Sequence, residues 1–107
     1  MAENIEVYRL TWRGIEIEAR YEPLKWSVIA HLEVESIKPE RAPLPISLTG
    51  YKSDFHQPGT IEAHGGDVAA QVIAWLDEEA ESQEWKDHLE ASRQGDLFAQ
   101  NQQEADR

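Results

Sequence analysis

The sequence predicts an α+β fold in which a three- to four-stranded antiparallel sheet, an N-terminal meander, is followed by C-terminal helices packed on one face. Three observations lead to this fold class. Residues 5–22 alternate apolar and polar side chains on both sides of Arg13-Gly14, which is typical of a β-hairpin. A second alternating run covers residues 24–35, and an apolar stripe with helical spacing covers residues 68–80.

The residues of the first hairpin predict its register. Gly14 can supply the positive φ that a tight two-residue turn needs. If Trp12 faces Ile15 across the turn, the apolar side chains of both arms fall on one face. Arg9 then lies opposite Glu18 on the other face, which is a favourable cross-strand charge pair.

The next alternating run predicts a third strand with one dry and one wet face. The residues expected on its buried face are Leu24, Trp26, Val28, Ala30, Leu32 and Val34. Pro39 is expected to end this strand, because proline cannot donate to a sheet ladder. Ile46 and Leu48 then predict a short fourth strand or edge segment that ends near Gly50.

A long loop over residues 50–66 is expected to separate the sheet from the helices, and loops of this length are often functional. Asp67 follows two glycines and can cap the first turn of a helix. The helical apolar phase slips after Ala80, which predicts a break near Ser82. A second, shorter helix would then carry Trp85 and Leu89. Trp12, Trp26 and Trp75 are all expected on the core side.

Composition limits the classes of function. The chain has 107 residues, which predicts a single α+β domain over residues 1–93 and a largely disordered C-terminal tail over residues 94–107. It has no cysteine, a net charge of −11, no apolar run long enough to span a bilayer and no N-terminal leader pattern. We therefore expect a cytoplasmic protein that binds neither nucleic acid nor membranes directly.

No residue set in the sequence has the spacing of a known catalytic centre, so we expect no enzyme and no cofactor. None of the serines lies in a GxSxG context. Asp54, His56 and His64 share the predicted loop and could converge on a divalent metal. Their spacing, however, matches no helical metal motif.

The tail contains the one short motif that points to a partner. Gln94-Gly95-Asp96-Leu97-Phe98 resembles the pentapeptide by which bacterial proteins bind the DNA polymerase sliding clamp, usually written QL(S/D)LF. The resemblance implies that Gln94 enters a small polar pocket, that Asp96 fills the Ser/Asp position and that Leu97 and Phe98 fill the main groove. Gly95 stands where that motif prefers leucine.

The same apolar pair has a structural alternative. After a glycine that ends a helix, Leu97 and Phe98 could fold back and cover the core of their own domain, as C-terminal apolar contacts commonly do. The sequence leaves the clamp-binding interpretation and this stapling interpretation open.

The domain itself is similar to a group of small proteobacterial proteins, some encoded near plasmid or phage genes. The segments that carry this similarity are Leu10-Thr11-Trp12-Arg13-Gly14, His31-Leu32-Glu33-Val34-Glu35-Ser36, Pro43-Leu44-Pro45-Ile46, Thr49-Gly50-Tyr51 and Ala74-Trp75-Leu76-Asp77. The group has no known activity, so it transfers no functional residue.

We therefore expect a bacterial accessory protein that acts through protein–protein contact, with the sliding clamp as its candidate partner. Two alternatives stay open. The acidic charge could mimic DNA and inhibit a host DNA-binding protein, in which case the acids should cluster on one face. The 50–66 loop could instead bind a metal or a small ligand. The sequence does not determine the oligomeric state.

Overall fold

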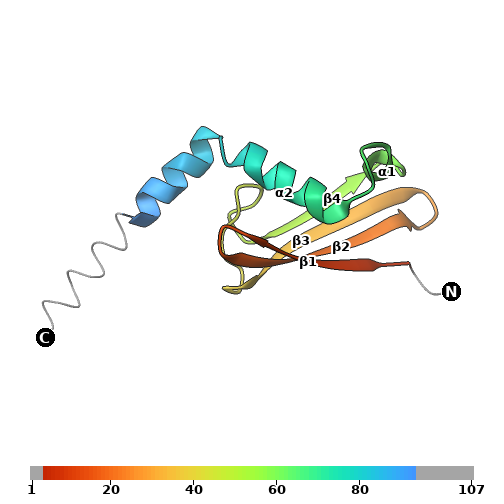
Figure 1. Cartoon of the computed structure of the whole chain (residues 1–107), viewed down its shortest axis with the longest axis horizontal. Coiled ribbons are helices and arrows are strands. Elements are labelled where there is room, and N and C mark those ends of the chain that lie inside the picture. The colour runs from red at the N-terminus through yellow and green to blue at the C-terminus, as the bar shows by residue number, and fades with distance from the viewer. Residues whose placement is uncertain (1–3, 94–107) are drawn as a thin grey trace, which may run out of the picture.

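The computed structural model describes residues 4–93 and shows an open four-stranded antiparallel sheet covered by helices (Figure 1). The strands pair in the order β1-β2-β3-β4 and are β1 (Glu6–Trp12), β2 (Ile15–Lys25), β3 (Ile29–Lys38) and β4 (Tyr51–His56). The helices are α1 (Thr60–Ala63), α2 (Val68–Glu79) and a further helical segment over residues 83–93. The α+β class and the meander are confirmed.

The first hairpin has the predicted register. Trp12 pairs with Ile15, and the ladder continues with regular pairing to Glu6. Arg13 and Gly14 both have positive φ, 47° and 83°, which is the backbone that a two-residue turn of matching twist requires. The Arg9 side chain donates to Glu18 at 3.0 Å on the outer face of the sheet.

The predicted third strand is wrong over its first residues. Its residues 24 and 25 belong to the end of β2, and a turn through Trp26 and Ser27 precedes β3. Both turn residues have positive φ without a glycine or asparagine that would have indicated it. Leu24, Trp26 and Val28 are consequently exposed, Trp26 by 69%, whereas the later members of the run, Ala30, Leu32 and Val34, are buried as expected.

The fourth strand also lies later in the chain than predicted. Leu44 and Ser47 form an isolated bridge within a turn, and Leu48 is exposed. The strand that pairs with β3 is β4, so the segment predicted as a loop over residues 50–66 contains a strand and the short helix α1. The sequence of β4 alternates, but its inward positions are polar, which hid it from a hydrophobic pattern.

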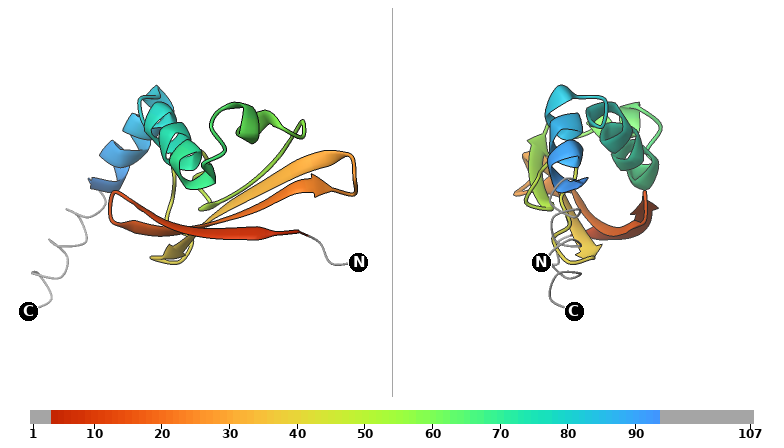
Figure 2. Two further views of the ribbon diagram at one scale, coloured as in Figure 1. Left: turned by 45° about the vertical axis from the view of Figure 1, so that its right-hand side comes forward. Right: turned by 90° about the vertical axis from the view of Figure 1, so that its left-hand side faces the viewer.

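The helices lie on one face of the sheet, as predicted (Figure 2). The Asp67 side chain accepts the backbone N–H of Ala70 at 3.0 Å and so caps α2. The buried side of α2 carries Val68, Val72 and Leu76. The predicted break is present, because the Ser82 hydroxyl accepts the backbone N–H of Trp85 at 3.1 Å at the start of the last helical segment.

The core lies between the sheet and α2 and includes two tryptophans. Its buried residues are Leu10, Trp12, Ile17, Ala19, Tyr21, Ala30, Leu32, Val34, Leu44, Ile61, Val68, Val72, Leu76, Ala80 and Trp85. The rings of Trp12 and Trp85 lie 6.2 Å apart and are tilted by 57°. Trp75 is partly buried against the core. Within residues 4–93, each helix is too short or too polar to cross a membrane.

A hydrogen bond between the core and α2 gives a testable stability effect. The indole N–H of buried Trp12 donates to Asp77 Oδ1 at 2.9 Å. Asp77→Ala is expected to lower the free energy of unfolding by about 1–2 kcal/mol, because the indole N–H then lacks its carboxylate partner. Urea unfolding followed by circular dichroism measures this change. Glu78→Ala, at the next exposed position, is the control and should change stability by less than about 0.5 kcal/mol; equal losses would contradict the prediction.

Candidate functional site

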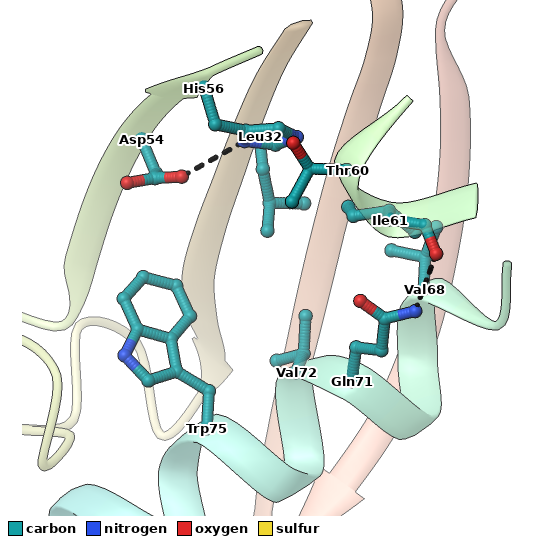
Figure 3. A pocket seen from close by; sticks show the side chains of 9 residues that line it. All are labelled: Leu32, Asp54, His56, Thr60, Ile61, Val68, Gln71, Val72 and Trp75. Atoms are coloured by element: carbon teal, nitrogen blue, oxygen red, sulfur yellow. Dashed lines mark hydrogen bonds and ion pairs between the residues drawn. The ribbon is translucent and has the colours of Figure 1, made fainter. Parts of the chain in front are cut away.

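A cavity of about 320 Å³ lies on the helical side of the sheet, where α1 and α2 approach the inner face of β4 (Figure 3). Its lining residues are Leu32, Asp54, His56, Thr60, Ile61, Val68, Gln71, Val72 and Trp75. We call it the β4–α2 cavity. Most of its lining is apolar, and its polar groups come from β4, α1 and α2.

The cavity exists because α2 does not cover the whole sheet. This helix packs mainly against β1 and β2, at the opposite side of the sheet from β4. Asp54 and His56 project to the inner side of β4, since they pair with the core positions Leu32 and Ala30 of β3. The short helix α1 fills part of the remaining gap and places Ile61 against the core.

His56 and Asp54 form a dyad in this cavity. Nδ1 of His56 lies 3.0 Å from Oδ2 of Asp54, and the imidazole stacks on the ring of Tyr21 at a centroid distance of 6.2 Å. Burial, with the hydrogen bond that Tyr21 donates to Glu62, raises the pKa of Tyr21 above its ordinary value. The other ring nitrogen of His56, Nε2, is buried and has no hydrogen-bond partner among the described residues.

Gln71 joins the two helices that border the cavity. Its amide nitrogen donates to the carbonyl of Ile61 at 2.9 Å and to that of His64 at 3.1 Å. Because both donor positions are used on backbone carbonyls, the amide oxygen faces the interior of the cavity (Figure 3). The Thr60 hydroxyl donates to the carbonyl of Gln57 at 2.7 Å.

The three residues considered as metal ligands do not come together. Asp54 and His56 are neighbours, but His64 lies at the end of α1 and its Nδ1 is 2.8 Å from the carbonyl oxygen of Thr60. Within residues 4–93, no group of three or more His, Cys, Asp or Glu side chains is placed to hold a metal. The three candidate side chains therefore do not converge, because β4 and α1 divide the segment that was expected to be one loop.

The outer face of the sheet has a charged centre around Arg20, which we call the Arg20 cluster. Its guanidinium contacts Glu18 at 2.6 Å, Glu35 at 3.1 Å and Glu33 at 3.4 Å. Arg41 reaches Glu35 at 3.2 Å, so the cluster continues toward β4. The three carboxylates are thus paired with arginines on this face.

Hydrogen bonds in the Arg20 cluster shift several pKa values. The hydrogen bond from Arg20 lowers the pKa of Glu18, and those from Tyr51 and Arg20 lower the pKa of Glu33. The hydrogen bond that Tyr51 donates to Glu33 raises the pKa of the Tyr51 phenol. Burial opposes the charge of Arg20, but its hydrogen bonds to the glutamates outweigh burial and raise its pKa.

Exposed aromatic side chains occupy one end of the same outer face. The ring of Phe55 stacks on His31 at 4.2 Å and lies 6.3 Å from the ring of Trp26. His31 is also 2.7 Å from the hydroxyl of Ser53. Sequence reasoning missed this group because Trp26 was assigned to the core.

The tail residues Gln94, Asp96, Leu97 and Phe98 lie outside the described residues. The helical segment that precedes them borders a second cavity of about 390 Å³, which we call the Trp85 cavity. Its lining residues are Trp12, Arg13, Ile15, Pro39, Ala42, Pro43, Trp85, His88 and Leu89.

Sequence reasoning also missed Gln71 and Arg20. Only a tertiary contact shows that Gln71 ties α1 to α2. Along β2, Glu18 and Glu22 each lie two residues from Arg20, so the three side chains fall on the same face of the strand. A cationic residue at this phase opposite acidic positions of β3 is the signal that could have identified the cluster.

These features define a small α+β domain with an open antiparallel sheet, helices on one face and an inner cavity beside its edge strand. The family model described as KlcB third domain matches residues 5–85, which is most of the chain, and the protein therefore belongs to this family. Comparisons with curated proteins and with solved structures give no match.

Proposed function

We propose that this protein is a bacterial cytoplasmic accessory protein that acts through protein–protein contact and is tethered by its tail to the DNA polymerase sliding clamp. The observation that carries the proposal is the motif Gln94-Gly95-Asp96-Leu97-Phe98. In such a short linear motif, a few buried anchors supply most of the binding free energy. Leu97 and Phe98 are the apolar anchors, and Gln94 is the polar one.

The position of the motif relative to the domain supports this function. The family match ends at residue 85, before the motif begins. Trp85 is also the last buried residue of the described chain, and residues 86–93 are exposed except for the half-buried His88. In Figure 1 this helical segment extends away from the sheet. A motif attached to such a helix can enter a partner's groove without unfolding the domain.

The charge of the domain agrees with an indirect role at DNA. With a net charge of −11, the protein is repelled by phosphates and would reach replicating DNA through another protein. The acidic-decoy alternative has weaker support, since the central carboxylates of the outer sheet face are paired with Arg20 and Arg41.

Titration of the full chain against the sliding clamp of its own organism tests the proposal. We expect saturable binding that is lost in the Leu97→Ala, Phe98→Ala double variant, because both apolar anchors are removed. Gly95→Leu should tighten binding by about tenfold, since one more buried leucine side chain is worth on the order of 1.5 kcal/mol. Asn101→Ala, Gln102→Ala is the matched control in the same tail and should bind like the wild type.

The stapling alternative predicts a different result. The Trp85 cavity borders the last helical segment and is lined by apolar side chains such as Ile15 and Leu89. If Leu97 and Phe98 occupied it, the double variant would melt at a lower temperature than the wild type, and neither protein would bind the clamp. That pair of outcomes would overturn the clamp proposal and assign the tail to its own domain.

A further inference from the structure

We propose that the β4–α2 cavity binds a small molecule that combines a planar aromatic body with hydrogen-bond donors, that is, a neutral aromatic N–H compound or a cationic arylalkylamine. This site is independent of the tail and of its partner. At about 320 Å³ the cavity is at the small end of the range of about 300–1,000 Å³ in which proteins hold small ligands. Its volume suits a body of one or two rings.

The walls of the cavity select an apolar, flat body. Leu32, Ile61, Val68 and Val72 form its inner surface, and all four are buried core residues. Trp75 stands along one side with its indole ring beside the open space (Figure 3). An aromatic ligand can pack against this indole, and a cationic group nearby gains from its π face.

The polar atoms at the cavity accept hydrogen bonds. Asp54 Oδ2 lies 3.0 Å from His56 Nδ1, which fixes the proton of a neutral imidazole on Nδ1 and leaves Nε2 as an acceptor. Gln71 uses its amide nitrogen on two backbone carbonyls, so its oxygen is available. The Asp54 carboxylate, 40% exposed, is the third acceptor. Three acceptors require a ligand that supplies N–H or O–H groups.

The buried Nε2 of His56 favours a ligand that donates a hydrogen bond, because this atom has no partner among the described residues. A buried acceptor without a partner costs on the order of 1–3 kcal/mol relative to a bonded one. In Figure 3 this atom lies at the end of the cavity bounded by Thr60. A ligand N–H placed there would recover that free energy, which an apolar ligand cannot do.

The electrostatics of the site disfavour anionic ligands. None of the nine lining residues is a lysine or an arginine, and Asp54 carries a negative charge at the rim. The net charge of −11 adds long-range repulsion of anions. Among molecules with the same ring, a cation should therefore bind best, a neutral donor less well and an anion least.

Tryptamine, indole and indole-3-acetate test this order, because they share one ring and differ in charge. We expect titration of the ¹⁵N-labelled full chain with tryptamine to shift the amide signals of Asp54, His56 and Gln71. Indole should bind more weakly and indole-3-acetate should not bind. Nuclear Overhauser contacts from the tryptamine ring to Val72 and Trp75 should place the ring in the cavity of the wild-type protein.

Two variants, His56→Phe and His31→Phe, distinguish binding in the cavity from binding to the acidic outer surface. Both keep an aromatic ring on the sheet, but His56 faces the cavity and His31 lies on the outer face. We expect His56→Phe to weaken tryptamine binding by about tenfold or more, through loss of the acceptor, and His31→Phe to leave it unchanged. Equal binding by wild type and His56→Phe, signal shifts centred on the Arg20 cluster, or equal binding of indole-3-acetate would each overturn the proposal.

Discussion

Replacement of Gly50 by alanine is expected to lower the free energy of unfolding by about 3 kcal/mol or more. Gly50 has a φ of +77°, which by itself costs an alanine about 1–2 kcal/mol. An added Cβ would also lie 2.5 Å from the carbonyl carbon of Arg41 and 2.6 Å from its oxygen. The backbone cannot easily move away, because the Gly50 carbonyl accepts the Ser36 N–H at 2.8 Å and its own N–H donates to Ser47 at 3.0 Å.

Gly14→Ala is the matched control for this prediction. Gly14 has a similar φ of +83°, but nothing lies within 4 Å of its added Cβ. It should therefore show only the backbone cost, about 1–2 kcal/mol. Urea unfolding of both variants, followed by circular dichroism, separates the steric term from the conformational one. Equal losses for the two variants would show that the contact with Arg41 relaxes without cost.

Arg20→Leu is expected to lower the free energy of unfolding by about 2 kcal/mol at pH 7. Among residues 4–93, it removes the one cation that contacts Glu18, Glu33 and Glu35 together, and leaves three carboxylates close to one another. The magnitude is below that of a fully buried pair because the Arg20 side chain is 25% exposed. Arg9→Leu is the control: this side chain is 59% exposed and its ion pair is with Glu18, so we expect a loss below about 0.5 kcal/mol.

The effect of Arg20→Leu should depend on pH in a defined direction. The pKa values of Glu18 and Glu33 are lower in the folded protein than in the unfolded chain. Carboxylates of this kind stabilise the fold fully above the unfolded pKa of about 4.3, and this stabilisation is lost as the pH falls through the folded pKa. The difference between wild type and variant should therefore shrink as the pH falls below about 5. A difference that stays constant over this range would contradict the role of Arg20.

Elements with one dry face and local turn chemistry could be predicted from the sequence. The first hairpin follows from a glycine turn and two alternating arms that agree in register. The capped helix α2 and the break at Ser82 follow from local hydrogen-bonding residues at helix starts. In each case the information lies within a few residues, so no distant contact is needed.

The turn at Trp26 and the strand β4 could not be predicted in the same way. Positive φ at Trp26 and Ser27 is imposed by the pairing of β2 with β3, and the alternating pattern continues through the turn without a change of phase. Strand β4 has polar side chains at its inner positions, so its place depends on the ladder with β3. A pattern of hydrophobic residues contains no information about either constraint.

The candidate site could be predicted in part. Asp54 and His56 were identified by residue type, and they are neighbours in the cavity. His64 was grouped with them through sequence proximity, which α1 overrides. Gln71 and Trp75 line the cavity because α2 packs mainly against β1 and β2, and this packing depends on the whole core. The interpretation of Leu97 and Phe98 rests on the motif alone.

The inner face of β4 has a consequence for association with other chains. Strand β4 is at the edge of the sheet, where unpaired backbone groups could accept a strand from another chain. Its inward positions are Lys52, Asp54 and His56, which pair with the core positions of β3. A strand added beside β4 would extend the dry layer over these ionisable groups, at a high desolvation cost. These ionisable groups, two of which give the cavity its polarity, therefore discourage edge-to-edge aggregation at β4.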